Sequence, residues 1–263
     1  PYTIGMSRLN TITMLLVSAL CVSASPVKAD PVNYTLITIL ATNDLHGRVM
    51  PTDGTSGLAQ AATLIRRIRA EVPNVLLLDA GDIIHGTPED YFSQGMATVS
   101  AMNAVGYSAA TPGNHEFDFG LDVAENVLSS ASFPFVAANI RSAAGGQWSR
   151  LGQYVVFTVD GVRVAVFGLA TPETITLQWP GSMRQIVLDN PFETAARIVP
   201  EIKPNADVVV ALSHLGLKSD KLLAEKVQGI DFIIGGHSHD VVADWLWAGD
   251  TLITQAGAYA RAL

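Results

Sequence analysis

The amino-acid sequence predicts an α/β fold whose strands run in mixed directions. Short apolar stretches alternate with segments of helical periodicity, which is typical of strands connected by helices. Two of these stretches are separated only by Asp160 and Gly161, a pair that favours a tight antiparallel hairpin. The 263 residues are 49% hydrophobic and 15% charged, so the chain has enough apolar side chains for a packed core and is not disordered.

The predicted elements follow one another from residue 34 onward. Strands are expected at residues 34–41, 75–78, 109–111, 136–140, 154–159, 162–169, 208–212, 232–234 and 252–254. Helices are expected at residues 58–69, 96–105, 121–129 and 192–202, with Pro200 close to the end of the last one. A glycine-containing surface loop is expected at residues 141–149, and no repeat or linker divides the chain.

Residues 1–29 are expected to be a secretory signal peptide with a few residues upstream of its start. Arg8 precedes an apolar run over residues 12–22, which is too short to span a bilayer. Val27 and Ala29 supply the small residues of a cleavage site, so cleavage is predicted after Ala29. The sequence therefore predicts a periplasmic or secreted protein with no stable membrane span after leader removal.

Composition excludes several function classes. The 24 acidic residues against 16 basic ones give a net charge of −8, which argues against a nucleic-acid partner. Cys21 is the single cysteine and lies in the predicted leader, so neither a disulfide scaffold nor a zinc finger is expected. The oligomeric state is left open by these data.

Metal-binding residue types follow five of the predicted strands. They are Asp44 and His46, Asp82, Asn114 and His115, His214, and His237 and His239. Because functional groups gather beyond the carboxyl ends of strands in α/β sheets, these loops are expected to meet. Nitrogen and oxygen ligands without thiolates suit Zn²⁺, Mn²⁺, Co²⁺ or Fe. So many ligands call for two divalent metal ions. The two ions would share a carboxylate and lie about 3.5–4 Å from each other. His85, the remaining histidine, is assigned to the surroundings of the site.

These motifs together resemble the signature of calcineurin-like metallophosphoesterases. The run TPGNHEFDFG at residues 111–120 resembles more narrowly the secreted branch of 5′-nucleotidases, UDP-sugar hydrolases and 2′,3′-cyclic-nucleotide phosphodiesterases. The resemblance extends from about Leu36 to the end of the chain. It implies a four-layer αββα sandwich with mixed sheets, and an incomplete catalytic domain over residues 30–263. A C-terminal substrate-binding domain would be absent, so the fold is expected to be truncated at the C-terminus.

The resemblance also implies a role for each site residue. One metal would be held by Asp44, His46, Asp82 and His239. The other would be held by Asp82, Asn114, His214 and His237, with Asp82 bridging both ions. His115 would be the catalytic imidazole, and Asp118 would orient it.

The activity implied is hydrolysis of phosphate esters of nucleotides, or of another small phosphoester, with a metal-bridged hydroxide as nucleophile. Two divalent ions contribute +4 against −2 from Asp44 and Asp82, so an anionic substrate is compatible with an acidic protein. Two alternatives remain. One is a thiosulfohydrolase of sulfur oxidation on the same scaffold, and the other is a catalytically idle fragment that binds metal or nucleotide.

Overall fold

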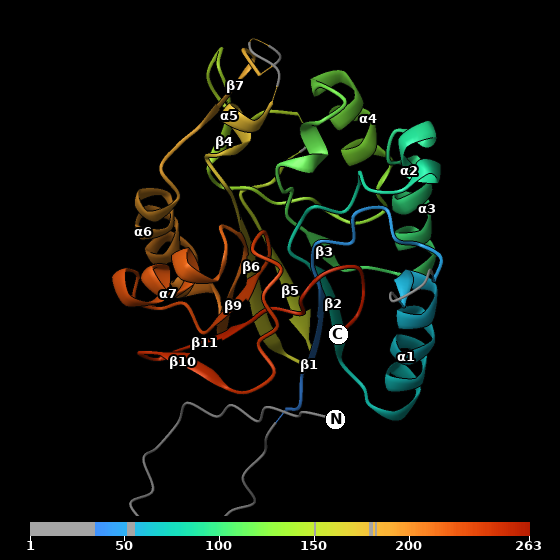
Figure 1. Cartoon of the computed structure of the whole chain (residues 1–263). Coiled ribbons are helices and arrows are strands. Elements are labelled where there is room, and N and C mark those ends of the chain that lie inside the picture. Colours follow the sequence, from blue (N-terminus) through green and yellow to red (C-terminus); the bar gives the residue numbers. More distant parts are fainter. Residues whose placement is uncertain (1–34, 52–55, 150, 179–180, 182) are drawn as a thin grey trace, which may run out of the picture.

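The computed structural model describes residues 35–51, 56–149, 151–178, 181 and 183–263. The predicted signal peptide lies outside these described residues. In the described part, two sheets lie face to face between two groups of helices, as Figure 1 shows.

The first sheet is formed by the N-terminal third of the described chain. Its strand order is β1-β2-β3, and neighbouring strands are parallel. The strands are β1 (Thr38–Thr42), β2 (Val75–Asp79) and β3 (Ala109–Ala110). Its helices are α1 (Gly57–Glu71), α2 (Pro88–Ser93), α3 (Met96–Val105) and α4 (Leu121–Ser130), with the short 3₁₀ helix η1 (His115–Phe117) after β3.

The second sheet has the strand order β10-β11-β9-β8-β6-β5. The strands are β5 (Tyr154–Val159), β6 (Val162–Ala170), β8 (Val208–His214), β9 (Phe232–Gly235), β10 (Leu246–Ala248) and β11 (Thr251–Thr254). The four central strands are parallel, whereas β5 and β10 are antiparallel to their neighbours. The remaining elements are β4 (Ile140–Ser142), α5 (Thr174–Leu177), β7 (Ile186–Leu188), α6 (Pro191–Ile202), η2 (Lys203–Asn205) and α7 (Leu217–Lys226). The prediction of mixed strand directions is confirmed.

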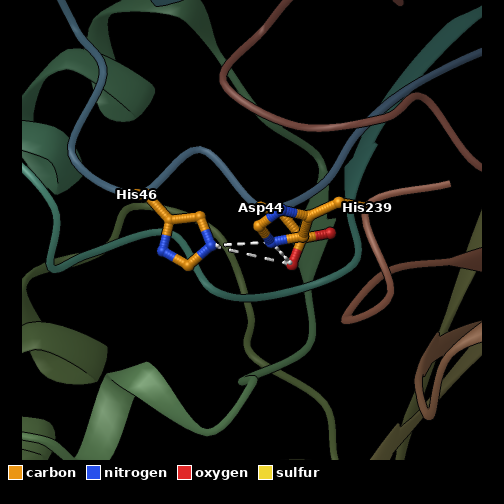
Figure 2. A group of neighbouring side chains, drawn as sticks. All are labelled: Asp44, His46 and His239. Carbon is orange, nitrogen blue, oxygen red and sulfur yellow. Dashed lines mark hydrogen bonds and ion pairs between the residues drawn. The ribbon is translucent and has the colours of Figure 1, made fainter. Parts of the chain in front are cut away.

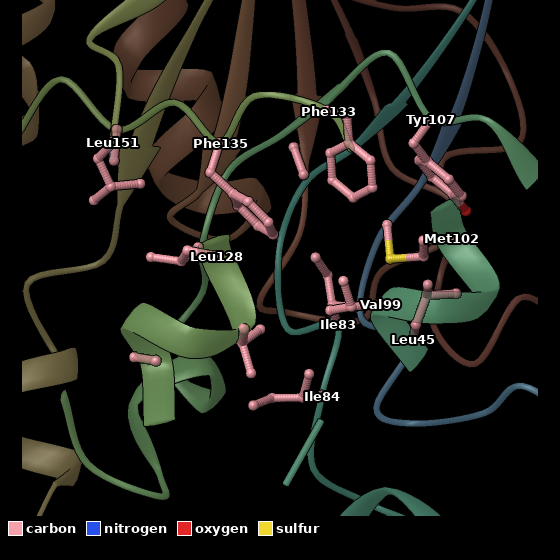
Figure 3. Packing of buried hydrophobic residues seen from close by; sticks show 14 of the residues in the cluster. Leu45, Ile83, Ile84, Val99, Met102, Tyr107, Leu128, Phe133, Phe135 and Leu151 are labelled. Carbon is pink, nitrogen blue, oxygen red and sulfur yellow. The ribbon is translucent and has the colours of Figure 1, made fainter. Parts of the chain in front are cut away.

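Three hydrophobic clusters separate four layers. Side chains alternate between the two faces of a strand, so Leu77 of β2 faces α1, α3 and α4, while Leu76 and Leu78 face the second sheet. In β6, Val164 faces the first sheet, and Ala165 packs toward α6 and α7. Figure 3 shows the first of these clusters, between the first sheet and its helices. The helix–sheet–sheet–helix order confirms the predicted four-layer αββα architecture.

Local sequence explains two of the element boundaries. The β5–β6 hairpin turns at Asp160 and Gly161, whose φ angles of 48° and 82° both fall in the left-handed region that a two-residue turn of this kind requires. The helix α6 begins after Asn190, whose side chain accepts hydrogen bonds from the N–H groups of Phe192 and Glu193. Pro200 lies inside this helix, which ends two residues later.

The structure differs from the sequence prediction in a few places. Residues 136–140 do not form a strand: Val136 makes an isolated bridge to Gly152, and β4 begins only at Ile140. The short elements α2, α5, β7 and β10, and the helix α7, were not predicted, because their apolar residues are too few to show a period. None of the described helices is long and apolar enough to cross a membrane.

Candidate metal and catalytic site

The residues predicted as metal ligands meet where the two sheets bring their carboxyl ends together. Loops after β1, β2 and β3 reach this point from the first sheet, and loops after β8 and β9 reach it from the second. The neighbouring parallel strands β1 and β2 end in register, as do β8 and β9, so the loops that follow start side by side. The arrangement therefore depends on both sheets.

The first ligand group consists of Asp44, His46 and His239, which Figure 2 shows converging on one point. The Nε2 atoms of His46 and His239 are 3.0 Å apart. Asp44 Oδ1 lies 3.4 Å from Nε2 of His239 and 4.0 Å from Nε2 of His46. Asp44 and His46 are buried, whereas His239 is exposed, so the group opens to solvent on one side.

The second ligand group consists of Asp82, His214 and His237. The Nε2 atom of His214 lies 3.0 Å from Asp82 Oδ2, and the His214 and His237 rings have centroids 5.0 Å apart. The same Asp82 oxygen is 4.0 Å from Nε2 of His46 in the first group. Asp82 thus stands between the two groups, as expected of a shared carboxylate.

Hydrogen bonds orient two of the imidazoles. The Nδ1 atom of His46 lies 3.1 Å from the His85 carbonyl oxygen, and Nδ1 of His214 lies 2.7 Å from the Ala80 carbonyl oxygen. Since a carbonyl only accepts, each Nδ1 carries the hydrogen in these contacts. A neutral ring with its hydrogen on Nδ1 presents the lone pair of Nε2 to the cluster, which is the form in which a histidine would ligate a metal.

Two buried polar atoms in the described part of the site lack hydrogen-bond partners, Asn114 Oδ1 and His214 Nε2. Buried polar groups are almost always hydrogen-bonded, so the Asn114 oxygen calls for an explanation. His214 Nε2 has only the Asp82 carboxylate oxygen nearby, at 3.0 Å. A cation would satisfy the Asn114 oxygen and the Nε2 of a neutral His214. The donor set of carboxylates, one amide oxygen and imidazoles fits a divalent transition ion such as Zn²⁺, Mn²⁺ or Co²⁺.

The electrostatics of the site also favour added positive charge. Burial acts to lower the pKa of His214, yet the negative charge of Asp82 outweighs it and raises the pKa to about 10. Burial acts to raise the pKa of Asp82, but His214 holds that pKa well below its usual range. The carboxylates thus stabilise a cation among the imidazoles, which is the role a bound metal would take over.

A second ring of carboxyl groups and amides holds the ligand loops. The Glu116 carboxylate is fully buried and accepts from the N–H groups of Asp82, Ile83 and Ile84 and from that of Gly113 at 2.5 Å. It ties the loop after β2 to the loop after β3. Burial raises the pKa of Glu116 to about 7.

Two further residues hold the loops after β1 and β2. Asp79 accepts from Thr42 Oγ1 at 2.6 Å and from the N–H of Gly81 at 2.8 Å, so it supports the turn that leads to Asp82. The Asn43 amide donates to Asp44 Oδ2 and accepts from the N–H of Ala256. Both residues therefore support the loops that carry Asp44 and Asp82.

The backbone of the ligand loops is unusual. Asp44, His46, Asp82, His237 and His239 all have φ between 48° and 75°, in the left-handed region. Side chains other than glycine occupy it at a cost of about 1–3 kcal/mol each, and such residues cluster at functional sites. The hydrogen bonds of the surrounding carboxyl and amide groups maintain these conformations.

His115 and Asp118 lie beside the two ligand groups. Asp118 Oδ2 is 2.5 Å from His115 Nδ1, and the backbone N–H of His115 donates to Asp82 Oδ1 at 2.9 Å. One ring nitrogen of His115 lies within 4.8 Å of ligand atoms of His46 and Asp82. Burial acts to lower the pKa of His115, but the hydrogen bond to Asp118 and nearby negative charges raise it to about 9. These contacts favour the protonated form of the imidazole.

Three residues of the site escaped the sequence analysis. Gln178 donates to Asp118 Oδ1 at 2.7 Å, Glu173 Oε2 lies 3.2 Å from Nε2 of His237, and the Tyr259 ring lies 5.5 Å from the rings of His46 and His239. None of them belongs to a strand-end motif. His85 is closer to the chemistry than expected, since its Nδ1 contacts Asp118 Oδ2.

Comparison with known proteins agrees with this geometry. The profile of the calcineurin-like phosphoesterase family matches residues 37–241. The chain is 35% identical over 266 residues to the trifunctional nucleotide phosphoesterase protein YfkN of Bacillus subtilis, covering 86% of this chain and 18% of that protein. It is 37% identical over 220 residues to the 5′-nucleotidase of Homo sapiens, covering 77% and 38% of the two chains.

Among solved structures, the 5′-nucleotidase precursor of Thermus thermophilus superposes with a TM-score of 0.76 at 31% identity, over 85% of this chain and 49% of that one. The chain thus spans about two fifths of the length of the human 5′-nucleotidase and a smaller share of YfkN.

Proposed function

From the premise that this chain belongs to the calcineurin-like phosphoesterase family, we propose that it hydrolyses phosphate esters of nucleotides with the help of two divalent metal ions. The observation that carries the proposal is the pair of ligand groups that meet at Asp82, together with the buried Asn114 oxygen that has no hydrogen-bond partner. Such a pair of neighbouring sites is the arrangement used for in-line displacement at phosphorus.

The proposed ligands divide between the two ions as the motifs imply. Asp44, His46 and His239 would hold one ion, Asn114, His214 and His237 would hold the other, and Asp82 would be shared by both. When bound, the ions supply Lewis acidity toward the phosphoryl oxygens and activate a water molecule.

His115 acts on the leaving group in this scheme. Asp118 holds Nδ1, and the backbone of His115 is fixed to Asp82. The other ring nitrogen, Nε2, is then free to place a proton on the leaving alkoxide or to stabilise its developing charge. A positioned general acid of this kind contributes roughly 10²–10⁴-fold in rate.

The proposal also includes nucleotides as the substrate class and export of the protein. The nucleotide phosphoesterase and 5′-nucleotidases that the chain resembles support nucleotides as substrates. The leader pattern in residues 1–29 supports export to the periplasm or medium. Sequencing the N-terminus of exported protein tests the latter: a start at Asp30 supports it, and a retained leader contradicts it.

Phosphate release from AMP, UDP-glucose, 2′,3′-cyclic AMP and an aryl phosphate tests the activity. We expect hydrolysis that EDTA abolishes and that Mn²⁺, Co²⁺ or Zn²⁺ restores. Full activity in metal-free protein would contradict the two-metal scheme. Cleavage of a thiosulfate ester in place of phosphate esters would favour the thiosulfohydrolase, and metal binding without any turnover would favour the idle fragment.

A further inference from the structure

A third group of ligand atoms lies beside the two groups assigned above. It consists of His85 Nδ1, His115 Nδ1 and Asp118 Oδ2, all within 4.8 Å of one another. The two nitrogen atoms are 3.2 Å apart, Asp118 Oδ2 is 2.5 Å from His115 Nδ1, and the same oxygen contacts His85 Nδ1. None of the three residues is a ligand of either proposed ion.

Contacts outside the group position His85 and Asp118. The backbone N–H of His85 donates to Asp90 Oδ2 at 2.5 Å, and the His85 ring packs edge-on against Phe119 with centroids 5.8 Å apart. Gln178 donates to Asp118 Oδ1, which leaves Oδ2 directed at the two imidazoles. The fold therefore directs His85 and the Asp118 carboxylate toward the His115 ring.

The chemistry of the group and the spacing of its two nitrogen atoms fit a transition-metal site, whereas the Asp118 oxygen lies at hydrogen-bonding distance from both nitrogens. Zinc binds imidazole nitrogen at about 2.0–2.1 Å, so two nitrogen ligands at a tetrahedral angle lie roughly 3.3 Å apart. Two imidazoles and a carboxylate suit Zn²⁺, Co²⁺ or Ni²⁺, whereas Mg²⁺ prefers oxygen ligands. The side chains of His85, His115 and Asp118 are 41%, 32% and 17% exposed, so an ion can enter and keep water in an open position.

We propose that His85, His115 and Asp118 form a third cation site that takes Zn²⁺ or a similar ion. An ion there replaces the hydrogen bond between His115 Nδ1 and Asp118, and the proton of that bond passes to the solvent. Asp118 must withdraw by about 0.8 Å from His115 to reach ligand spacing. This inference rests on the proposed function at one step: occupancy of the third site separates His115 Nδ1 from Asp118, which orients the imidazole there, so excess Zn²⁺ inhibits the enzyme.

The direct test counts bound zinc. Full-length protein is titrated with ZnCl₂ by calorimetry, and crystals soaked in ZnCl₂ are examined by anomalous diffraction. We expect a third equivalent in the wild type, with an anomalous peak between His85 and Asp118. The third equivalent is lost in His85→Gln and retained in the control Tyr91→Phe, which changes an exposed ring near Phe119. No third peak in the wild type, or an unchanged one in His85→Gln, overturns the proposal.

A second variant and an activity measurement complete the test. Asp118→Asn also removes the third equivalent, so misfolding of one variant does not leave the question open. If the chain hydrolyses phosphoesters, excess ZnCl₂ lowers turnover by roughly tenfold or more in the wild type but not in His85→Gln, while excess Mg²⁺ leaves both unchanged. If it hydrolyses none, the proposed function fails, but the zinc count still decides the third site.

Discussion

A methyl group added at Gly113 tests how the site depends on the close approach of its loops. Gly113 lies between the loop after β2 and the ring of His214. A Cβ atom at this position would lie 2.6 Å from the Asp82 backbone nitrogen and 2.6 Å from His214 Nε2, and it would also collide with Asp82 Oδ1. The φ angle of Gly113 is outside the left-handed region, so Gly113→Ala acts through contact and not through backbone strain.

The size of the effect follows from these distances. Ordinary van der Waals contact of a Cβ begins at 3.4 Å, so the Asp82 nitrogen and His214 Nε2 must retreat by about 0.8 Å, and Asp82 Oδ1 by more. Neither can do so freely, because Glu116 binds the Asp82 N–H and Ala80 binds the His214 ring. Overpacking of this kind costs about 1–3 kcal/mol in unfolding free energy. A displacement near 1 Å at catalytic groups lowers the rate by roughly 10²-fold.

The assay compares Gly113→Ala with Gly152→Ala. A Cβ at Gly152 meets its nearest neighbour at 3.5 Å, also without a left-handed φ, so this control is expected to stay within about 0.5 kcal/mol of the wild type. Urea unfolding, bound metal and phosphate release are measured for both variants. If Gly113→Ala matched Gly152→Ala in all three, the inference that these loops set the ligand positions would be refuted.

Three further predictions follow from the site. His115→Ala should retain both metal ions and lose roughly 10²–10⁴-fold in turnover; elemental analysis showing loss of metal would make His115 a ligand instead. Glu116→Gln should weaken metal binding by about 10–100-fold, because an amide cannot accept from all four N–H groups that Glu116 binds; an unchanged zinc titration would contradict this. Asp220→Asn should flatten the pH dependence of stability. Burial raises the pKa of Asp220 to about 7, despite the hydrogen bond from Ser213. The native state therefore holds this proton more tightly than the unfolded state, and its contribution to stability is lost as pH rises from about 4 to 7. The difference between the unfolding free energies at pH 5 and pH 8 should be smaller in the variant than in the wild type, by at most about 3 kcal/mol. Parallel pH profiles of the two proteins would refute this assignment.

The fold class could be predicted because its signals are local. The Asp160-Gly161 turn and the apolar face of the helix α1 (Gly57–Glu71) depend only on residues close in sequence. The helix α3 was predicted with the observed ends, residues 96 and 105. Residues 136–140 were predicted wrongly because Val136 contacts Gly152 as an isolated bridge, which depends on a segment distant in sequence.

The sequence by itself determined which residue types end the strands, and therefore the identity of the candidate ligands. The resemblance implied that Asp82 is shared, but only the tertiary structure decided the distances from its carboxylate to His46 and His214, which come from different sheets. It also decided the role of Glu116, whose carboxylate joins two loops, and the contact of His85 with Asp118, 33 residues away. The physical reason is that a strand-end motif consists of consecutive residues and can be recognised locally. The distances between motifs depend on how the two sheets pack.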